Sequence, residues 1–173
     1  LLPSLRLLEN GANIDIQLRE QMDYARILYN KGLYLQSLKI LDKLKELAGN
    51  YNQVSLLVQV LSLEKHIESL HITRSLASRA GELAAEATQV AERLTLVTHL
   101  SNLALQLYGW YINNGHARSR SEEEAVTLFF KEQLPPALPS EATFYQKLYL
   151  HQRYCWYAFI RQDSLMYYRH TQK

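Results

Sequence analysis

The chain has 173 residues and a formal net charge of +2; 47% of its residues are hydrophobic and 21% are charged. This length suits one domain with a substantial core, and this composition excludes a wholly disordered chain. The small net charge excludes a strong positive field for nucleic acid, and no apolar run reaches the roughly 20 residues of a membrane span.

Two helices joined by a tight turn are predicted over residues 14–31 and 33–48. Within each range apolar residues recur at threes and fours, as they do on one face of a helix. Gly32 separates the two stripes, because glycine adopts the left-handed conformation that ends helices without a steric penalty. So short a turn makes the helices antiparallel. Three residues lie off the second stripe and are expected to face water: Lys39, Lys43 and Lys45.

Four more helices are predicted over 51–71, 74–92, 94–113 and 121–134. No glycine or proline separates Glu82 from Tyr108, and one helix of that length would far exceed the typical length of about 11–12 residues. We therefore expect a break near residues 93–95. Ser121 and Glu124 have the spacing of a capping box at the start of the fourth of these helices.

Two further predicted helices, 141–160 and 163–173, complete the chain. No segment alternates apolar and polar residues as a half-buried strand would, so the fold class is predicted to be all-α. The chain begins with Leu1 rather than Met and ends at Lys173 within a helical pattern. We therefore expect a single domain over 1–173 that is a fragment of a longer protein.

The predicted helices form four pairs with a spacing of about 35–45 residues, which is typical of helical-hairpin repeats. The first pair resembles the tetratricopeptide repeat in Ala25, Leu28, Gly32, Tyr34, Ser37, Leu41 and Leu44. A looser match uses Leu107, Tyr108, Tyr111, Gly115, Ala125 and Phe129. The resemblance implies a right-handed α-solenoid of about four stacked hairpins with an extended curved surface. A compact helical bundle is the alternative.

In tetratricopeptide-like repeats the first helix of each hairpin lines the concave face. The resemblance therefore implies that a partner segment contacts eight residues: Arg19, Arg26, Tyr29, Asn30, Asn102, Asn113, Gln152 and Trp156. Guanidinium and amide groups among them can hydrogen-bond an extended peptide backbone or a carboxylate. For any single one of these residues, a solvated helix face is the preferred interpretation.

Two pairs of residues have side chains of the kinds that bind metals or catalyse reactions. Glu68 and His71 have the i, i+3 spacing of di-iron bundles, but the second motif of such sites is missing, so a solvated helix end and no metal are expected. His151 and Cys155 lie one helical turn apart without an orienting third group, so core packing of the thiol is preferred over catalysis. We expect no cofactor and no enzyme, with a cysteine-dependent enzyme as a distant alternative. The single cysteine also favours a reducing, cytoplasmic location.

Aromatic residues concentrate at the C-terminal end: fourteen of the eighteen follow residue 107. Residues 142–173 also carry five Lys or Arg against one acid. Packing in the core or between repeats is the preferred interpretation, with a partner surface or base stacking as alternatives. Three arginines recur every eight residues, a spacing that forms no stripe on a helix: Arg153, Arg161 and Arg169.

The sequence therefore predicts a non-enzymatic scaffold that binds a protein or peptide. We expect neither nucleic acid, nor a membrane, nor a small-molecule substrate as its partner. The alternative is a sensory or regulatory domain that binds a signal peptide or a small ligand.

Overall fold

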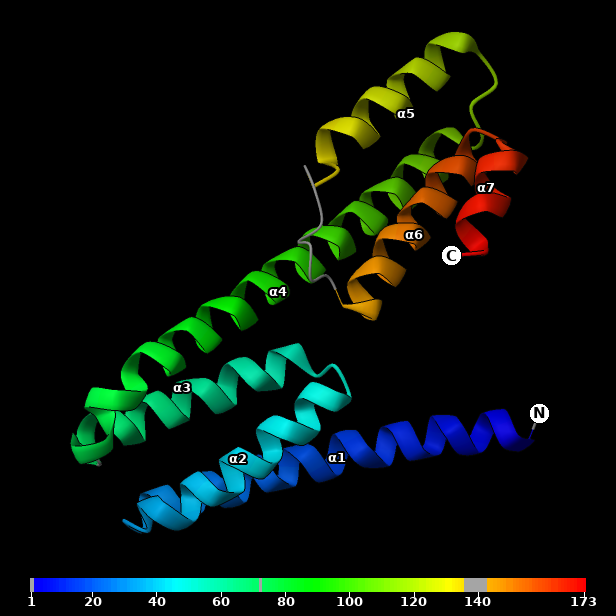
Figure 1. The fold of residues 1–173 in the computed structure, drawn as a ribbon. Helices are drawn as coiled ribbons and strands as arrows, with labels where there is room; N and C mark the ends of the chain where they lie inside the picture. Colours follow the sequence, from blue (N-terminus) through cyan, green and yellow to red (C-terminus); the bar gives the residue numbers. More distant parts are fainter. Residues whose placement is uncertain (1, 72, 136–142) are drawn as a thin grey trace. The chain divides into compact units, whose positions relative to one another are not determined.

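The protein is all-α, as its sequence predicts. The structure, a computed structural model, describes residues 2–71, 73–135 and 143–173, and the side chains of 14–71, 79–135 and 143–173. Within these residues there is no strand, and the chain forms seven helices (Figure 1): α1 Leu2–Asn30, α2 Tyr34–Asn50, α3 Val54–His71, α4 Thr73–Asn114, α5 Arg120–Gln133, α6 Phe144–Ile160 and α7 Ser164–Thr171. Residues 141 and 142, where the first helix of the last pair is predicted to begin, lie outside the described residues.

The chain divides into two compact units, Leu1–Glu92 and Arg93–Lys173, and the boundary falls within α4. The predicted break near residues 93–95 is therefore wrong as a break in the helix, although the change of unit occurs there. The physical reason is that this stretch contains no residue that stops a helix and is rich in the strong helix formers Ala, Leu and Glu. The second and third predicted pairs consequently share one continuous helix.

In the first unit, α1 and α2 form an antiparallel hairpin around small residues. Gly32, with φ of +74°, ends α1 as predicted. Ala25 and Ser37 are fully buried at the helix contact, and the Ser37 hydroxyl donates to the Ala25 carbonyl at 2.8 Å. A larger side chain at either position would separate the helices. The apolar stripes of both helices meet here, and their buried members are Leu18, Met22, Leu41, Leu44 and Ala48.

The turn between α2 and α3 uses a different residue from its counterpart after α1. Asn52, with φ of +53°, occupies the left-handed conformation, and the amide of Gln53 donates to the Ala48 carbonyl at 2.8 Å. Asparagine adopts this conformation more readily than other residues with a Cβ. Beyond the turn, α3 packs on α2 through buried residues that include Val54, Leu57 and Leu61.

The first unit also contains a buried ionic network that is not predicted from the sequence. Glu64 and Glu68 of α3 are buried, so the prediction that Glu68 belongs to a solvated helix end is wrong. Lys45 of α2 donates to Glu64 at 2.9 Å and to Glu86 of α4 at 3.0 Å. Arg79 of α4 forms ion pairs with Glu64, and with Glu68 at 3.5 Å. Lys45 was predicted to face water, and it instead joins three helices.

In the second unit, the C-terminal half of α4 packs with α5 and α6. The buried cluster consists of Leu103, Leu107, Val126, Phe130, Tyr157 and Ile160, and half-buried aromatic residues surround it. The rings of Phe130 and Tyr157 stack nearly parallel with centroids 4.2 Å apart. Part of the aromatic enrichment is therefore core packing within this unit, as the preferred interpretation expects.

The helices of the second unit begin at side-chain caps. The capping box of α5 uses Ser119 and Glu122 rather than the predicted Ser121 and Glu124. Glu122 accepts from the amides of Arg118 and Ser119, and these hydrogen bonds lower the pKa of its carboxyl group. The box begins two residues earlier because the chain already turns helical at Arg120. Thr143 caps α6 in the same way, and Asp163 caps α7 by accepting from the Met166 amide.

Candidate functional site

Two of the residues predicted to bind a partner, Arg26 and Tyr29, lie beside side chains of α3. The Arg26 guanidinium donates to the Gln59 amide oxygen at 3.0 Å, and the Tyr29 hydroxyl lies 2.9 Å from His66 Nε2. An open pocket of about 450 Å³ lies at this junction of α1 and α3. Its lining is polar at the rim and apolar beneath: Met22, Arg26, Val58, Gln59, Ser62, Leu63 and His66. We call it the α1/α3 pocket.

His66, which lines the α1/α3 pocket, belongs to a cluster of four rings. Tyr29 lies within 5.5–5.8 Å, between ring centroids, of Tyr34, His66 and His71. Tyr34 and His71 stack face to face at 3.8 Å. These contacts hold Tyr29 beside the pocket. His71 is thus an exposed stacking partner of Tyr34.

The structure does not bring the other predicted contact residues of the first unit into this pocket. Arg19 is exposed and its side chain bonds to Asp15 of its own helix at 2.9 Å. That pairing raises the pKa of Arg19 through the hydrogen bond and the charge of Asp15. Asn30 is exposed at the end of α1. In the second unit, Asn102 and Asn113 are exposed on α4. All four side chains are exposed, and their contact with a partner stays a prediction.

In the second unit, Gln152 and Trp156 come together with residues that the sequence analysis did not assign to a site. An open pocket of about 540 Å³ is lined by Gln152, Arg153, Cys155, Trp156, Phe159 and Tyr167. We call it the α6/α7 pocket. Phe159 follows Trp156 by three residues, so helical spacing would have found it. Tyr167 belongs to α7, and its position depends on the turn at 161–163, which spacing alone does not determine.

The wall of the α6/α7 pocket is held by contacts between aromatic rings. Trp156 meets the rings of Tyr108 and Phe159 edge to face, with centroids 5.8 Å apart in each pair. Such pairs add about 0.5–1.5 kcal/mol each beyond the area they bury. The indole is therefore held by α4 and by its own helix before any ligand arrives.

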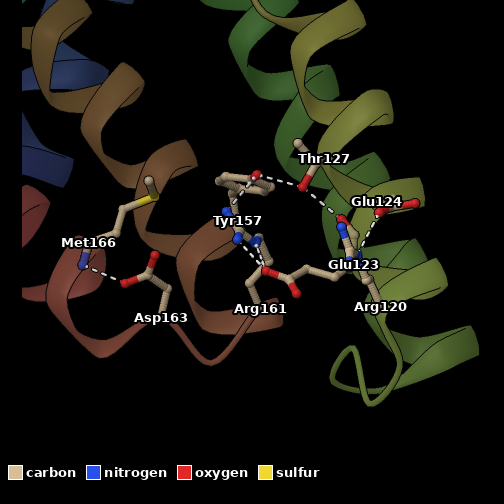
Figure 2. Close-up of polar contacts among 8 residues, drawn as sticks. All are labelled: Arg120, Glu123, Glu124, Thr127, Tyr157, Arg161, Asp163 and Met166. Atoms are coloured by element: carbon tan, nitrogen blue, oxygen red, sulfur yellow. Dashed lines mark hydrogen bonds and ion pairs between the residues drawn. The ribbon is translucent and has the colours of Figure 1, made fainter.

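A polar network links α5 to the end of α6 (Figure 2). Arg161 donates through Nε to the Glu123 carboxylate at 3.0 Å and through Nη1 to the Tyr157 hydroxyl at 3.0 Å. The Tyr157 hydroxyl also lies 2.9 Å from Thr127 Oγ1. The Glu123 hydrogen bond, which outweighs burial, raises the pKa of Arg161. Arg161 therefore links α5 to the end of α6.

His151 hydrogen-bonds to His170 and not to Cys155. His151 Nδ1 lies 2.9 Å from Nδ1 of His170 in α7. Burial raises the pKa of the Cys155 thiol, which favours the protonated and weakly nucleophilic form. Cys155 is half-buried beside the α6/α7 pocket rather than fully enclosed in the core.

The stability of the second unit should fall as the pH drops below about 6.5. Burial and nearby Lys173 lower the pKa of His151, and burial, His151, Lys173 and Arg169 lower that of His170. The unfolded chain protonates both near 6.5, whereas the folded protein does so only at lower pH. The unfolded state thus binds more protons in this window, and the stabilisation present above it is lost as pH falls.

Melting temperatures measured from pH 8 to pH 5 test this. His170→Gln should show a smaller decrease across that range than the wild-type chain. Equal decreases in both proteins would contradict the assignment. Lys131, which is exposed on α5 of the same unit, supplies the matched control variant Lys131→Gln, whose melting temperature should decrease across this range as that of the wild type does.

Comparison of the chain with family models, with curated proteins and with solved structures gives no match. The likeness to tetratricopeptide repeats therefore stays a prediction. Among the described residues, no group of three or more His, Cys, Asp or Glu side chains is arranged to hold a metal ion. In the same part of the chain, no helix is both long and apolar enough to cross a membrane.

Proposed function

We propose that the protein is an interaction module that binds a segment of a partner protein or peptide in the α1/α3 pocket. The observation that carries the proposal is the pairing of Arg26 with Gln59 above Met22, Val58 and Leu63. An extended segment could exchange backbone hydrogen bonds with these polar groups while an apolar side chain enters between the helices. In the tetratricopeptide-like prediction, α1 and α3 are the first helices of consecutive hairpins and would line the concave face, which supports the proposal.

The two polar side chains proposed to contact the partner, Arg26 and Gln59, form only weak contacts within the protein. Arg26 and Gln59 are both exposed, and the acid paired with Arg26 within its own helix, Asp23, lies at 3.8 Å. An exposed pair of this kind contributes at most about 1 kcal/mol to stability. A partner can therefore replace these contacts at little cost to the fold.

Selection of a random peptide library on the immobilised chain tests the proposal. Enriched peptides should bind Arg26→Ala or Gln59→Ala at least about tenfold more weakly, a loss of roughly 1.4 kcal/mol. Lys43→Ala, an exposed lysine on α2, is the matched control and should leave binding unchanged. Failure to enrich any peptide, or enriched peptides that bind all variants equally, would contradict the proposal.

The alternative, a sensory or regulatory domain for a signal peptide or small ligand, is favoured by one separate observation. The α6/α7 pocket in the second unit has a volume of about 540 Å³, which lies in the range of small-molecule sites. Its aromatic wall and few polar groups also suit a small ligand. This alternative and the peptide module use different residues, so binding experiments on the two pockets separate them.

A further inference from the structure

Arg153 is the buried cation of the second unit. Only 9% of its surface is exposed, and its Nε donates to the Leu100 carbonyl of α4 at 2.9 Å. A guanidinium group carries five N–H donors and stays charged, so one carbonyl satisfies only part of it. Among the described residues, no carboxylate forms an ion pair with Arg153. This side chain lines the α6/α7 pocket.

Burying a cation without an anion is unfavourable. Desolvation lowers the pKa of Arg153, although the nearby Tyr149 acts in the opposite direction. Proteins normally pair a buried arginine with a carboxylate, because an unpaired buried charge costs several kcal/mol. Arg161, at the C-terminal end of the same helix, does have a carboxylate partner, Glu123. Arg153 has no such carboxylate partner among the described residues, and it lines an open pocket instead.

The rest of the pocket indicates what kind of anion would fit. Trp156, Phe159 and Tyr167 provide aromatic surface, while Gln152 adds an amide that can both donate and accept. One buried guanidinium matches the single charge of a carboxylate and its two oxygens in a bidentate geometry. A doubly charged phosphate group would leave excess negative charge beside an apolar wall. The pocket thus combines one cationic anchor with an aromatic surface.

We propose that the α6/α7 pocket binds an organic carboxylate, with the carboxylate on Arg153 and an aromatic or aliphatic body against Trp156 and Phe159. Two sources offer this chemistry, a free small-molecule acid and the C-terminal carboxylate of a peptide. This proposal does not depend on the α1/α3 pocket, because every residue that it uses lies in the second unit.

Titration of the full 173-residue chain by calorimetry tests the proposal with paired probes. Phenylacetate and phenylacetamide differ only in charge and in one polar atom, and N-acetylglycylphenylalanine is compared with its C-terminal amide in the same way. At least one acid should bind ten or more times tighter than its amide. Binding of phenylacetate alone indicates a small-molecule acid, whereas binding of the peptide acid alone indicates a peptide terminus. Equal affinity of acid and amide in both pairs, or no binding by either acid, would overturn the proposal.

Variants identify the residue responsible. Arg153→Gln should abolish the preference for the acid, and Arg153→Lys should retain part of it through charge alone. Arg161→Gln is the matched control, since it removes an arginine that is engaged with Glu123, and it should keep the preference. A preference that survives in Arg153→Gln would place the carboxylate elsewhere and overturn the assignment. The comparison of acid with amide uses the wild-type chain, so it stands even if the loss of the Leu100 bond destabilises a variant.

Discussion

Replacing Arg79 with methionine should lower the free energy of unfolding by about 2–3 kcal/mol. Arg79 reaches from α4 to two carboxylates of α3, Glu64 and Glu68, whose side chains are 0% and 3% exposed. Removing one partner of a buried ion pair typically costs about 3–5 kcal/mol, because the remaining charge stays desolvated. The side chain of Arg79 is itself 39% exposed, and Lys45 still contacts Glu64, so the expected loss is smaller than that.

Denaturant unfolding of Arg79→Met beside Arg19→Met measures this effect. Arg19 forms an exposed ion pair with Asp15 one turn away on its own helix, and such pairs contribute little to stability because solvent screens the two charges. Both substitutions remove an arginine from a helix, so the difference between their free energies of unfolding measures the contribution of the buried network. Comparable losses in the two variants would show that α3 and α4 are not held together by these charges.

Local sequence signals predicted the helices where a stop residue is present. Gly32 ends the first helix as predicted, and the helix predicted over 163–173 is observed as α7, which Asp163 caps. The alternation of stripes and turns was enough to predict an all-α chain. These features could be predicted because glycine conformation and capping depend on neighbouring residues in the chain.

The continuity of α4 could not be predicted from average helix length. Gly81 and Gly109 lie inside the helix, and a Cβ built at either one would meet no atom within 4 Å, so neither marks a close contact. A helix ends where capping or packing favours another conformation, and nothing in the sequence around residue 93 does so. The change of unit at that point is a tertiary property, since it depends on which helices pack against each half.

The buried charges and the residues of the candidate site could not be predicted either, because they too depend on which helices pack together. Lys45 is polar and lies off the apolar stripe, yet Glu64 and Glu86 approach it from residues 19 and 41 positions away. Arg26 and Gln59 are likewise separated by 33 positions. Periodicity assigns a residue to a face of its own helix, but it carries no information about the side chains that the neighbouring helices contribute to that face.

Leu41→Ala should lower the free energy of unfolding by about 2–5 kcal/mol, the range for leucines in close-packed cores. Leu41 is 0% exposed on the face of α2 that packs against α1 and α3, so truncation removes three carbons and leaves a cavity. Lys43→Ala is the control on the same helix, because Lys43 is exposed and its substitution should cost less than about 0.5 kcal/mol. The loss should appear in the midpoint of denaturant unfolding with little change in its slope, since the surface exposed on unfolding stays nearly the same. Equal effects of the two substitutions would mean that α2 does not bury this face, and the hairpin that positions Arg26 would lose its physical basis.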